Sequence, residues 1–215
     1  MNYMINLIVN LISMPYVTIY AFVCTSIFCL IFQIVCLRKQ RTKKHFLKVY
    51  LFLLYLMSVY YVTGTGSIWD MMRPGFMIRP ETISLNPFEN TIDMLDVLNV
   101  MMMMPLGFLL PWIWPAFRNI WKTTLAGMIF SFFIEISQLL NLRATTTEDL
   151  ITNTLGTFLG YLIFKIIYKI FKSKKTCQND GKFMKEEAVI YLIGSFLGIF
   201  LLYNPLALIN FMWKI

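Results

Sequence analysis

Six ionisable or amide side chains lie inside three long apolar segments between residues 93 and 161. Side chains of these types could transfer a proton or bind a polar ligand. They are Asp96 and Asn99 in the first segment, Glu135 and Gln138 in the second, and Asp149 and Asn153 in the third. A charged side chain within a membrane-length apolar segment is costly to bury, and it tends to face the interior of a helical bundle or a water-filled cavity. These residues are therefore the first candidates for a functional site.

Helical spacing puts the polar and small residues of each segment on one face, because residues three or four apart are neighbours on an α-helix. The three faces consist of Asp93, Asp96, Asn99, Met103 and Gly107; of Gly127, Ser131, Glu135 and Gln138; and of Asp149, Asn153, Gly156 and Gly160. Each helix is expected to turn one polar or small-residue face toward its neighbours.

The composition is that of an integral membrane protein. Of 215 residues, 58% are hydrophobic and only 14% are charged, whereas a soluble domain has about 25% charged residues. Several apolar runs reach the length of about 18 residues or more that a transmembrane helix needs. The pattern predicts an all-α, polytopic bundle of about six transmembrane helices. The expected spans are residues 16–37, 46–63, 93–115, 122–142, 148–168 and 187–209.

Basic residues concentrate in two stretches between the expected spans, residues 38–44 and 165–185, and the net charge is +8. Short loops rich in Lys and Arg stay on the cytoplasmic side of a membrane. The pattern therefore predicts that both termini lie outside and that the polar residues converge toward the outer leaflet. The positive net charge is also explained by attraction to anionic lipid headgroups, and the lipid bilayer is therefore the expected partner. No nucleic-acid recognition motif accompanies it.

Metal, cofactor and histidine chemistry find little support in the sequence. The four cysteines, at positions 24, 29, 36 and 177, do not have the spacing of a metal site, and His45 is the only histidine. Zinc catalysis and a Ser-His-Asp triad both need histidine in an arrangement that this chain does not offer. We therefore expect no metal and no cofactor.

Several motifs resemble those of the VanZ-like family of bacterial membrane proteins. They are Asn86-Pro87-Phe88, Asn99 followed by Pro105-Leu106-Gly107, Glu135 with Gln138, Arg143, Asp149, and Asn153 with Gly156 and Gly160. The resemblance implies an all-helical fold in the bacterial cytoplasmic membrane and a role in the cell envelope, since family members are associated with low-level resistance to teicoplanin and related lipoglycopeptides. This chain departs from the family at Thr146, where an aspartate is common. The departure argues against a mechanism that needs a full acidic cluster, such as tight cation binding.

The chain divides by these features into four parts. Residues 1–63 form a hairpin of two spans, and residues 64–92 form an outer loop that begins at Gly64-Thr65-Gly66, a flexible exit from the membrane. Residues 86–170 form the VanZ-like core of three spans, and residues 171–215 form a basic loop and a final span. The oligomeric state is not indicated by the sequence.

The candidate site residues could have structural roles as well as functional ones. Glu135 could bind a ligand, act in proton transfer, or pair with Arg143 and so join the fourth span to the following turn. Asn99 and Gln138 could hydrogen-bond between helices, as could Asn153. Gly107, Gly156 and Gly160 are expected to serve close helix packing.

Three functions fit these readings. The leading hypothesis is a non-enzymatic envelope protein whose outward-facing polar pocket binds a lipid-linked cell-wall precursor or a lipoglycopeptide. An enzyme comes second, with Glu135 and Asp149 as an acid-base pair on a lipid phosphate or glycan and Arg143 stabilising negative charge. A proton-coupled transporter comes third, because membrane-embedded carboxylates also serve proton transfer.

Overall fold

The computed structural model describes residues 19, 22–23, 25–27, 29–34, 43–72, 76–77, 83–84, 93–141, 143, 145–171 and 186–202. The helices in this part of the chain are α2 (Lys43–Thr63), α3 (Ile68–Met71), α4 (Met94–Ile113), α5 (Ile120–Gln138), α6 (Thr147–Phe171) and α7 (Glu187–Leu202), with a 3₁₀ turn, η3, at Pro115–Phe117. Two short strands, β1 (Ile83–Ser84) and β2 (Thr145–Thr146), complete the elements. The described residues between 19 and 34 are also helical.

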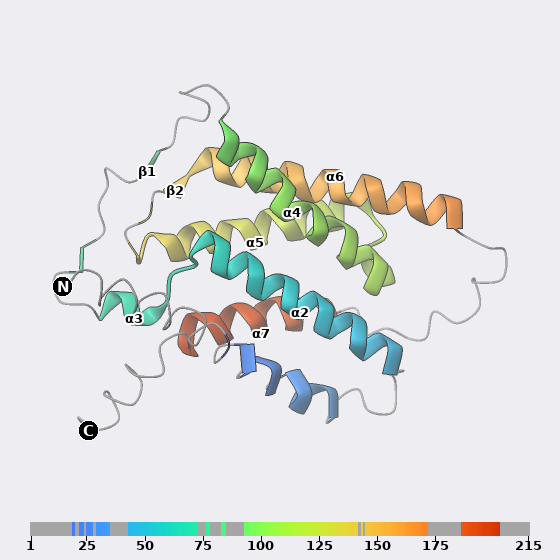
Figure 1. The fold of residues 1–215 in the computed structure, drawn as a ribbon, viewed down its shortest axis with the longest axis horizontal. Helices are drawn as coiled ribbons and strands as arrows, with labels where there is room; N and C mark the ends of the chain where they lie inside the picture. The colour runs from blue at the N-terminus through green and yellow to red at the C-terminus, as the bar shows by residue number, and fades with distance from the viewer. Residues whose placement is uncertain are drawn as a thin grey trace, which may run out of the picture.

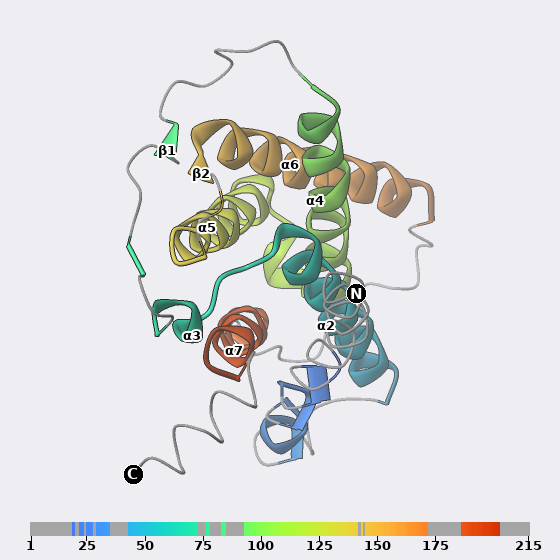
Figure 2. The same cartoon turned by 60° about the vertical axis from the view of Figure 1, so that its left-hand side comes forward.

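The protein is an all-α membrane bundle, as predicted. Within the described ranges α2, α4, α5 and α6 are long and apolar enough to cross a membrane, while α7 is a shorter apolar helix. The long helices run side by side, with α5 between α6 and α7 (Figures 1 and 2). The span expected at 16–37 and the end of the span expected at 187–209 lie partly outside the described residues.

Helix α4 continues through the Pro105-Leu106-Gly107 sequence. It runs without interruption from Met94 to Ile113 and contains both Pro105 and Pro111. Proline is tolerated inside membrane helices because neighbouring groups satisfy the backbone carbonyls that lose their partners. Asp93 caps the helix, since its side chain accepts hydrogen bonds from the backbone N–H groups of Leu95 and Asp96.

The region between α2 and α4 contains regular structure that the sequence did not predict. Strand β1 pairs in parallel with β2, so that Ile83 lies opposite Thr145 and Ser84 opposite Thr146. The turn at Gly64 is a buried, hydrogen-bonded turn instead of a flexible exit. Thr65 and Gly66 are buried, and the Gly66 N–H donates to Ser137 Oγ at 3.2 Å. The loop therefore packs on the end of α5.

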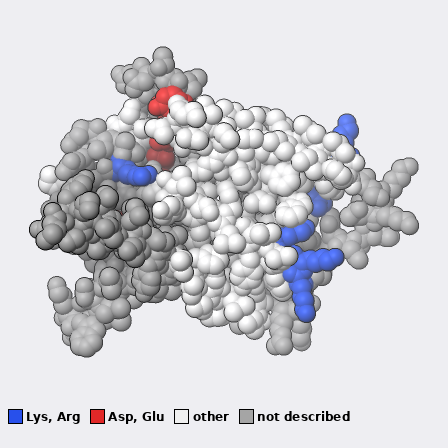
Figure 3. Space-filling model, viewed as in Figure 1, with Lys and Arg blue, Asp and Glu red and all other residues white. Residues whose placement is uncertain are grey.

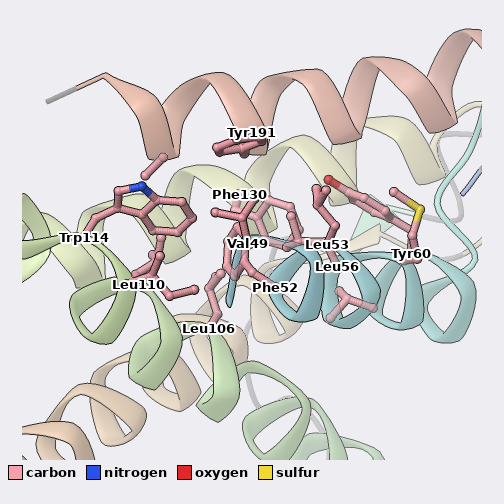
Figure 4. Packing of buried hydrophobic residues seen from close by; sticks show 14 of the residues in the cluster. Val49, Phe52, Leu53, Leu56, Tyr60, Leu106, Leu110, Trp114, Phe130 and Tyr191 are labelled. Carbon is pink, nitrogen blue, oxygen red and sulfur yellow. The ribbon is translucent and has the colours of Figure 1, made fainter. Parts of the chain in front are cut away.

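The apolar core lies where α2, α4, α5 and α7 meet (Figure 4). Its largest fully buried side chain is Trp114, whose ring meets the Phe52 ring edge-on at 5.2 Å between centroids. Tyr191 of α7 lies over the same indole at 6.0 Å. Aromatic pairs in this geometry add about 0.5–1.5 kcal/mol beyond the area that they bury. The core thus joins α7 to the rest of the bundle.

Helices α4 and α6 approach each other closely through the three glycines expected to serve packing. A Cβ atom on Gly107 would overlap the backbone of Thr157, and one on Gly160 would overlap the backbone of Met104. A Cβ on Gly156 would likewise meet the carbonyl of Val100. Helices in lipid associate by packing and hydrogen bonding, because lipid tails are as apolar as leucine, and small residues allow this approach.

The charged residues separate to the two ends of the bundle, as the face seen in Figure 3 illustrates. The basic end holds Lys43, Lys44, Lys48, Arg118, Lys122, Lys165 and Lys169, and the acidic end holds Asp93, Asp96, Glu135, Glu148 and Asp149. Arg143 departs from this separation, since it lies at the acidic end beside the last carbonyl of α2, and so do Glu186 and Glu187, which lie at the basic end where α7 begins. The candidate site residues are at this acidic end.

Candidate functional site

The site is a polar cluster between the acidic ends of α4, α5 and α6. We define the polar cluster as Asn99, Ser131, Glu135, Thr146, Asp149 and Asn153. Its first contact joins α4 to α6, where Asn99 Nδ2 donates to Asp149 Oδ1. Asp149 lies in the first turn of α6 and its backbone N–H donates to Thr146 Oγ1 at 3.0 Å. Thr146 therefore acts as a cap for α6.

One turn deeper, Asn153 joins α6 to α5. Its Nδ2 donates to Ser131 Oγ at 2.9 Å, and the residue is 2% exposed. Its Oδ1 atom is buried and has no hydrogen-bond partner. Gly127 lies next along the same face of α5, where a Cβ atom would overlap the side chain of Thr157. Helices α5 and α6 are therefore joined here by the hydrogen bond between Asn153 and Ser131 and, one turn away, by the close approach of Gly127 to Thr157.

Glu135 is a buried carboxylate without a cationic partner. Its side chain is 5% exposed, and its Oε2 accepts a hydrogen bond from the backbone N–H of Thr146 at 3.3 Å. No Lys, Arg or His among the described residues lies within ion-pair distance of it. Another carboxylate, that of Asp149, acts on Glu135 electrostatically. Burying a charge without a partner is costly, so the position of Glu135 is an unfavourable one for an ionised carboxylate.

Asp96 extends the acidic character of this end but has a structural role. Its Oδ2 accepts from the backbone N–H of Asp93 at 2.9 Å, so that the two residues form a capping box at the start of α4. Glu148 lies near Asp96 and Asp149, and the three carboxylates repel one another electrostatically. Among the described residues no group of three or more His, Cys, Asp or Glu has the arrangement of a metal site.

Arg143 does not pair with Glu135, which corrects the structural reading of the two residues. The Arg143 Nη1 donates instead to the carbonyl of Thr63, at the end of α2. Gln138 Nε2 donates to the same carbonyl at 2.7 Å, and Asn141 Nδ2 donates to the carbonyl of Gly64 at 2.6 Å. The last carbonyls of a helix have no partners within it, and they carry partial negative charge. The turn after α5 therefore caps α2.

Gln138 consequently lies apart from the polar cluster, although the sequence places it on the same face as Glu135. Its Nε2 donates to the carbonyl of Thr63 in α2, while its Oε1 is buried without a hydrogen-bond partner. The structure thus brings Asn99, Glu135, Asp149 and Asn153 together, and it places Gln138 and Arg143 on the neighbouring α2 turn.

A second buried polar contact, at the basic end, was not predicted. His45 Nε2 lies 2.6 Å from Glu187 Oε1, and the two side chains are 8% and 0% exposed. The contact joins the first turn of α2 to the first turn of α7. Glu187 opens an apolar segment in the sequence, but nothing in the spacing relates it to a histidine 142 positions earlier. The contact between His45 and Glu187 holds the start of α7 against the start of α2.

Fold and cluster together define a class: a polytopic helical membrane protein with a group of buried and half-buried polar side chains at one end. A family comparison narrows this class. A model of the VanZ/LLP1 family matches residues 51–168, more than half of the chain's 215 residues, and the chain belongs to this family. The match includes α4, α5, α6 as far as residue 168 and the whole polar cluster, and it ends before α7. Comparisons with curated proteins and with solved structures gave no match.

Proposed function

We propose that this protein binds the polar headgroup of a lipid-linked cell-wall precursor, or of a lipoglycopeptide, in the polar cluster and that it does so without chemistry of its own. The observation that carries the proposal is Glu135, a buried carboxylate with one backbone N–H as hydrogen-bond partner and no cation beside it. A carboxylate in this state keeps acceptor capacity for a ligand that brings O–H or N–H donors. Sugar and peptide headgroups are rich in such donors.

The surrounding groups fit a ligand of this kind. Asp149 adds a second carboxylate next to Glu135, and the buried Oδ1 of Asn153 is an acceptor without a partner. Arg143 lies on the adjacent α2 turn with an exposed side chain, where it would contact the phosphate of a lipid-linked precursor. Guanidinium groups suit phosphate because their donors form a planar fork. Acceptors for the headgroup and a cation for the phosphate would thus lie side by side.

In the proposed orientation the polar cluster opens to the outside of the cytoplasmic membrane. The basic end of the bundle carries seven of the described lysines and arginines, and loops with this charge stay on the cytoplasmic side. Precursors and lipoglycopeptides would then reach the site from the outer leaflet. Resistance to teicoplanin would follow if the bound headgroup or drug were withheld from its ordinary partner.

Binding to a purified lipid-linked disaccharide-peptide precursor tests the proposal. Glu135→Gln should weaken affinity at least about tenfold, because a hydrogen bond to a charged group contributes about 1.5–3 kcal/mol. Arg143→Ala should weaken it as well, whereas Lys165→Gln at the basic end should not. Unchanged affinity in both Glu135→Gln and Arg143→Ala would reject the polar cluster as the site.

An enzymatic reading has one observation in its favour, the proximity of a buried carboxylate, Glu135, to a half-buried one, Asp149. Such a pair could act as acid and base on a lipid phosphate or glycan. The binding experiment separates the two readings when the bound precursor is recovered and its mass is measured. Recovery of the intact precursor supports binding alone, and turnover that is lost in Glu135→Gln supports the enzyme.

A further inference from the structure

An apolar groove runs along the side of the bundle between α5 and α7. Its volume is about 500 Å³, within the range of about 300–1,000 Å³ that is usual for small-molecule sites. Ile129 and Phe133 line it from α5, and Ile193 and Leu197 line it from α7. Each of these four side chains is 45–53% exposed, so the groove opens to the outside of the bundle. It lies on the face of α5 opposite to Glu135.

Three polar contacts hold α7 against α2 and α3. Glu187 lies against His45 at the start of α7, and Ser195 Oγ lies 2.9 Å from Tyr60 Oγ in the middle. Near its end the carbonyl of Leu201 accepts from the indole of Trp69 at 2.7 Å. All three contacts are with the side of α7 that faces α2 and α3. The other side is left with apolar residues, and the groove there is held open.

The groove is charged at one end only. Lys122 lines it at the basic end of the bundle, and among the residues that the structure describes no other charged side chain lines it. From Lys122 to Phe133 α5 advances eleven residues, or about 16 Å at a rise of about 1.5 Å per residue. That is close to half of the roughly 30 Å of hydrocarbon in a bilayer. The groove thus has the depth of one leaflet, with a cation at the level of that leaflet's headgroups.

From this geometry we propose that the groove binds one acyl chain of an anionic phospholipid from the leaflet at the basic end, with the phosphate paired to Lys122. The apolar walls take the chain, and the ammonium group selects the negative headgroup. Basic residues near a membrane surface contribute about 1 kcal/mol each toward anionic lipids. The groove uses α7, which lies outside the part of the chain that matches the VanZ/LLP1 family. This proposal does not depend on the function proposed for the polar cluster.

Native mass spectrometry of the full-length protein with phosphatidylglycerol, and with phosphatidylcholine of the same acyl chains, tests the groove. One phosphatidylglycerol should be retained in preference to phosphatidylcholine. Lys122→Gln should lower this retention about fivefold, the factor that corresponds to about 1 kcal/mol. Lys165→Gln is the matched control, because Lys165 is exposed at the same end but does not line the groove.

A second arm of the experiment locates the bound acyl chain by crosslinking. Phosphatidylglycerol with a photoreactive group at the end of its acyl chain should crosslink to peptides that contain residues 129–133 and 193–197, at the end of the groove away from Lys122. Ala126→Trp, which fills the groove, should abolish these crosslinks, whereas Glu135→Gln should leave them unchanged. Equal retention of the two lipids, equal effects of Lys122→Gln and Lys165→Gln, or crosslinks spread over all helices would overturn the proposal.

Discussion

Replacing Gly160 by alanine should destabilise the bundle by separating α4 from α6. A Cβ atom at this position would lie well inside the 3.0 Å that real Cβ atoms keep from other atoms, and the group that it meets is the backbone of Met104. A backbone carbonyl in a helix cannot rotate away, so the helices must move. Overpacking of this kind costs about 1–3 kcal/mol, and the upper end applies here.

The helix-forming preference of alanine offsets part of this cost. Alanine is favoured over glycine in a helix by about 1 kcal/mol, so we expect Gly160→Ala to lower the free energy of unfolding by about 2 kcal/mol. The assay is reversible unfolding in mixed micelles followed by circular dichroism. Leu155→Ala is the control on the same helix, because Leu155 is 46% exposed and its truncation should have little effect. A Gly160→Ala variant as stable as the unmodified protein would refute the reasoning.

Three further predictions concern individual contacts, each measured by the same unfolding assay. A double-mutant cycle with His45→Leu and Glu187→Leu should give a coupling energy of about 2 kcal/mol, because hydrogen bonds to charged groups contribute about 1.5–3 kcal/mol; a value near zero would contradict the buried contact. The cycle with Asn153→Leu and Ser131→Ala should give only about 0.6 kcal/mol, the usual value for a hydrogen bond between membrane helices, and a value above about 2 kcal/mol would contradict this. Gly64→Ala should cost about 1–2 kcal/mol because Gly64 has a φ of 60°, and no loss of stability would show that the turn rearranges.

Much of the fold could be predicted because a membrane imposes length and composition on each helix. Residues 93–115 were expected to span, and α4 runs from Met94 to Ile113. This span contains Pro105, although proline ends or kinks a helix in soluble proteins. Strands β1 and β2 have two residues each, too few for any periodic signal. They form only because the turn after α5 brings Thr145 beside Ile83.

The polar cluster could be predicted only in part. Helical spacing was enough to place Asn99, Asp149 and Asn153 on faces that meet, because these faces belong to long regular helices. Spacing fails beyond the end of a helix, where the direction of Arg143 depends on the turn. The carbonyls at the end of α2 attract Arg143 and Gln138, and α2 is distant in the sequence. No local pattern reveals such a contact.

The central claim is that a polar headgroup binds between α4, α5 and α6, and the location of the bound ligand tests it most directly. A lipid-linked cell-wall precursor with a photoreactive group on its sugar can be crosslinked to the purified full-length protein and the modified peptides identified by mass spectrometry. The account predicts crosslinks within residues 96–99 and 131–149, and their loss when unlabelled precursor is in excess. Crosslinks confined to the basic end, or to the groove between α5 and α7, would contradict it.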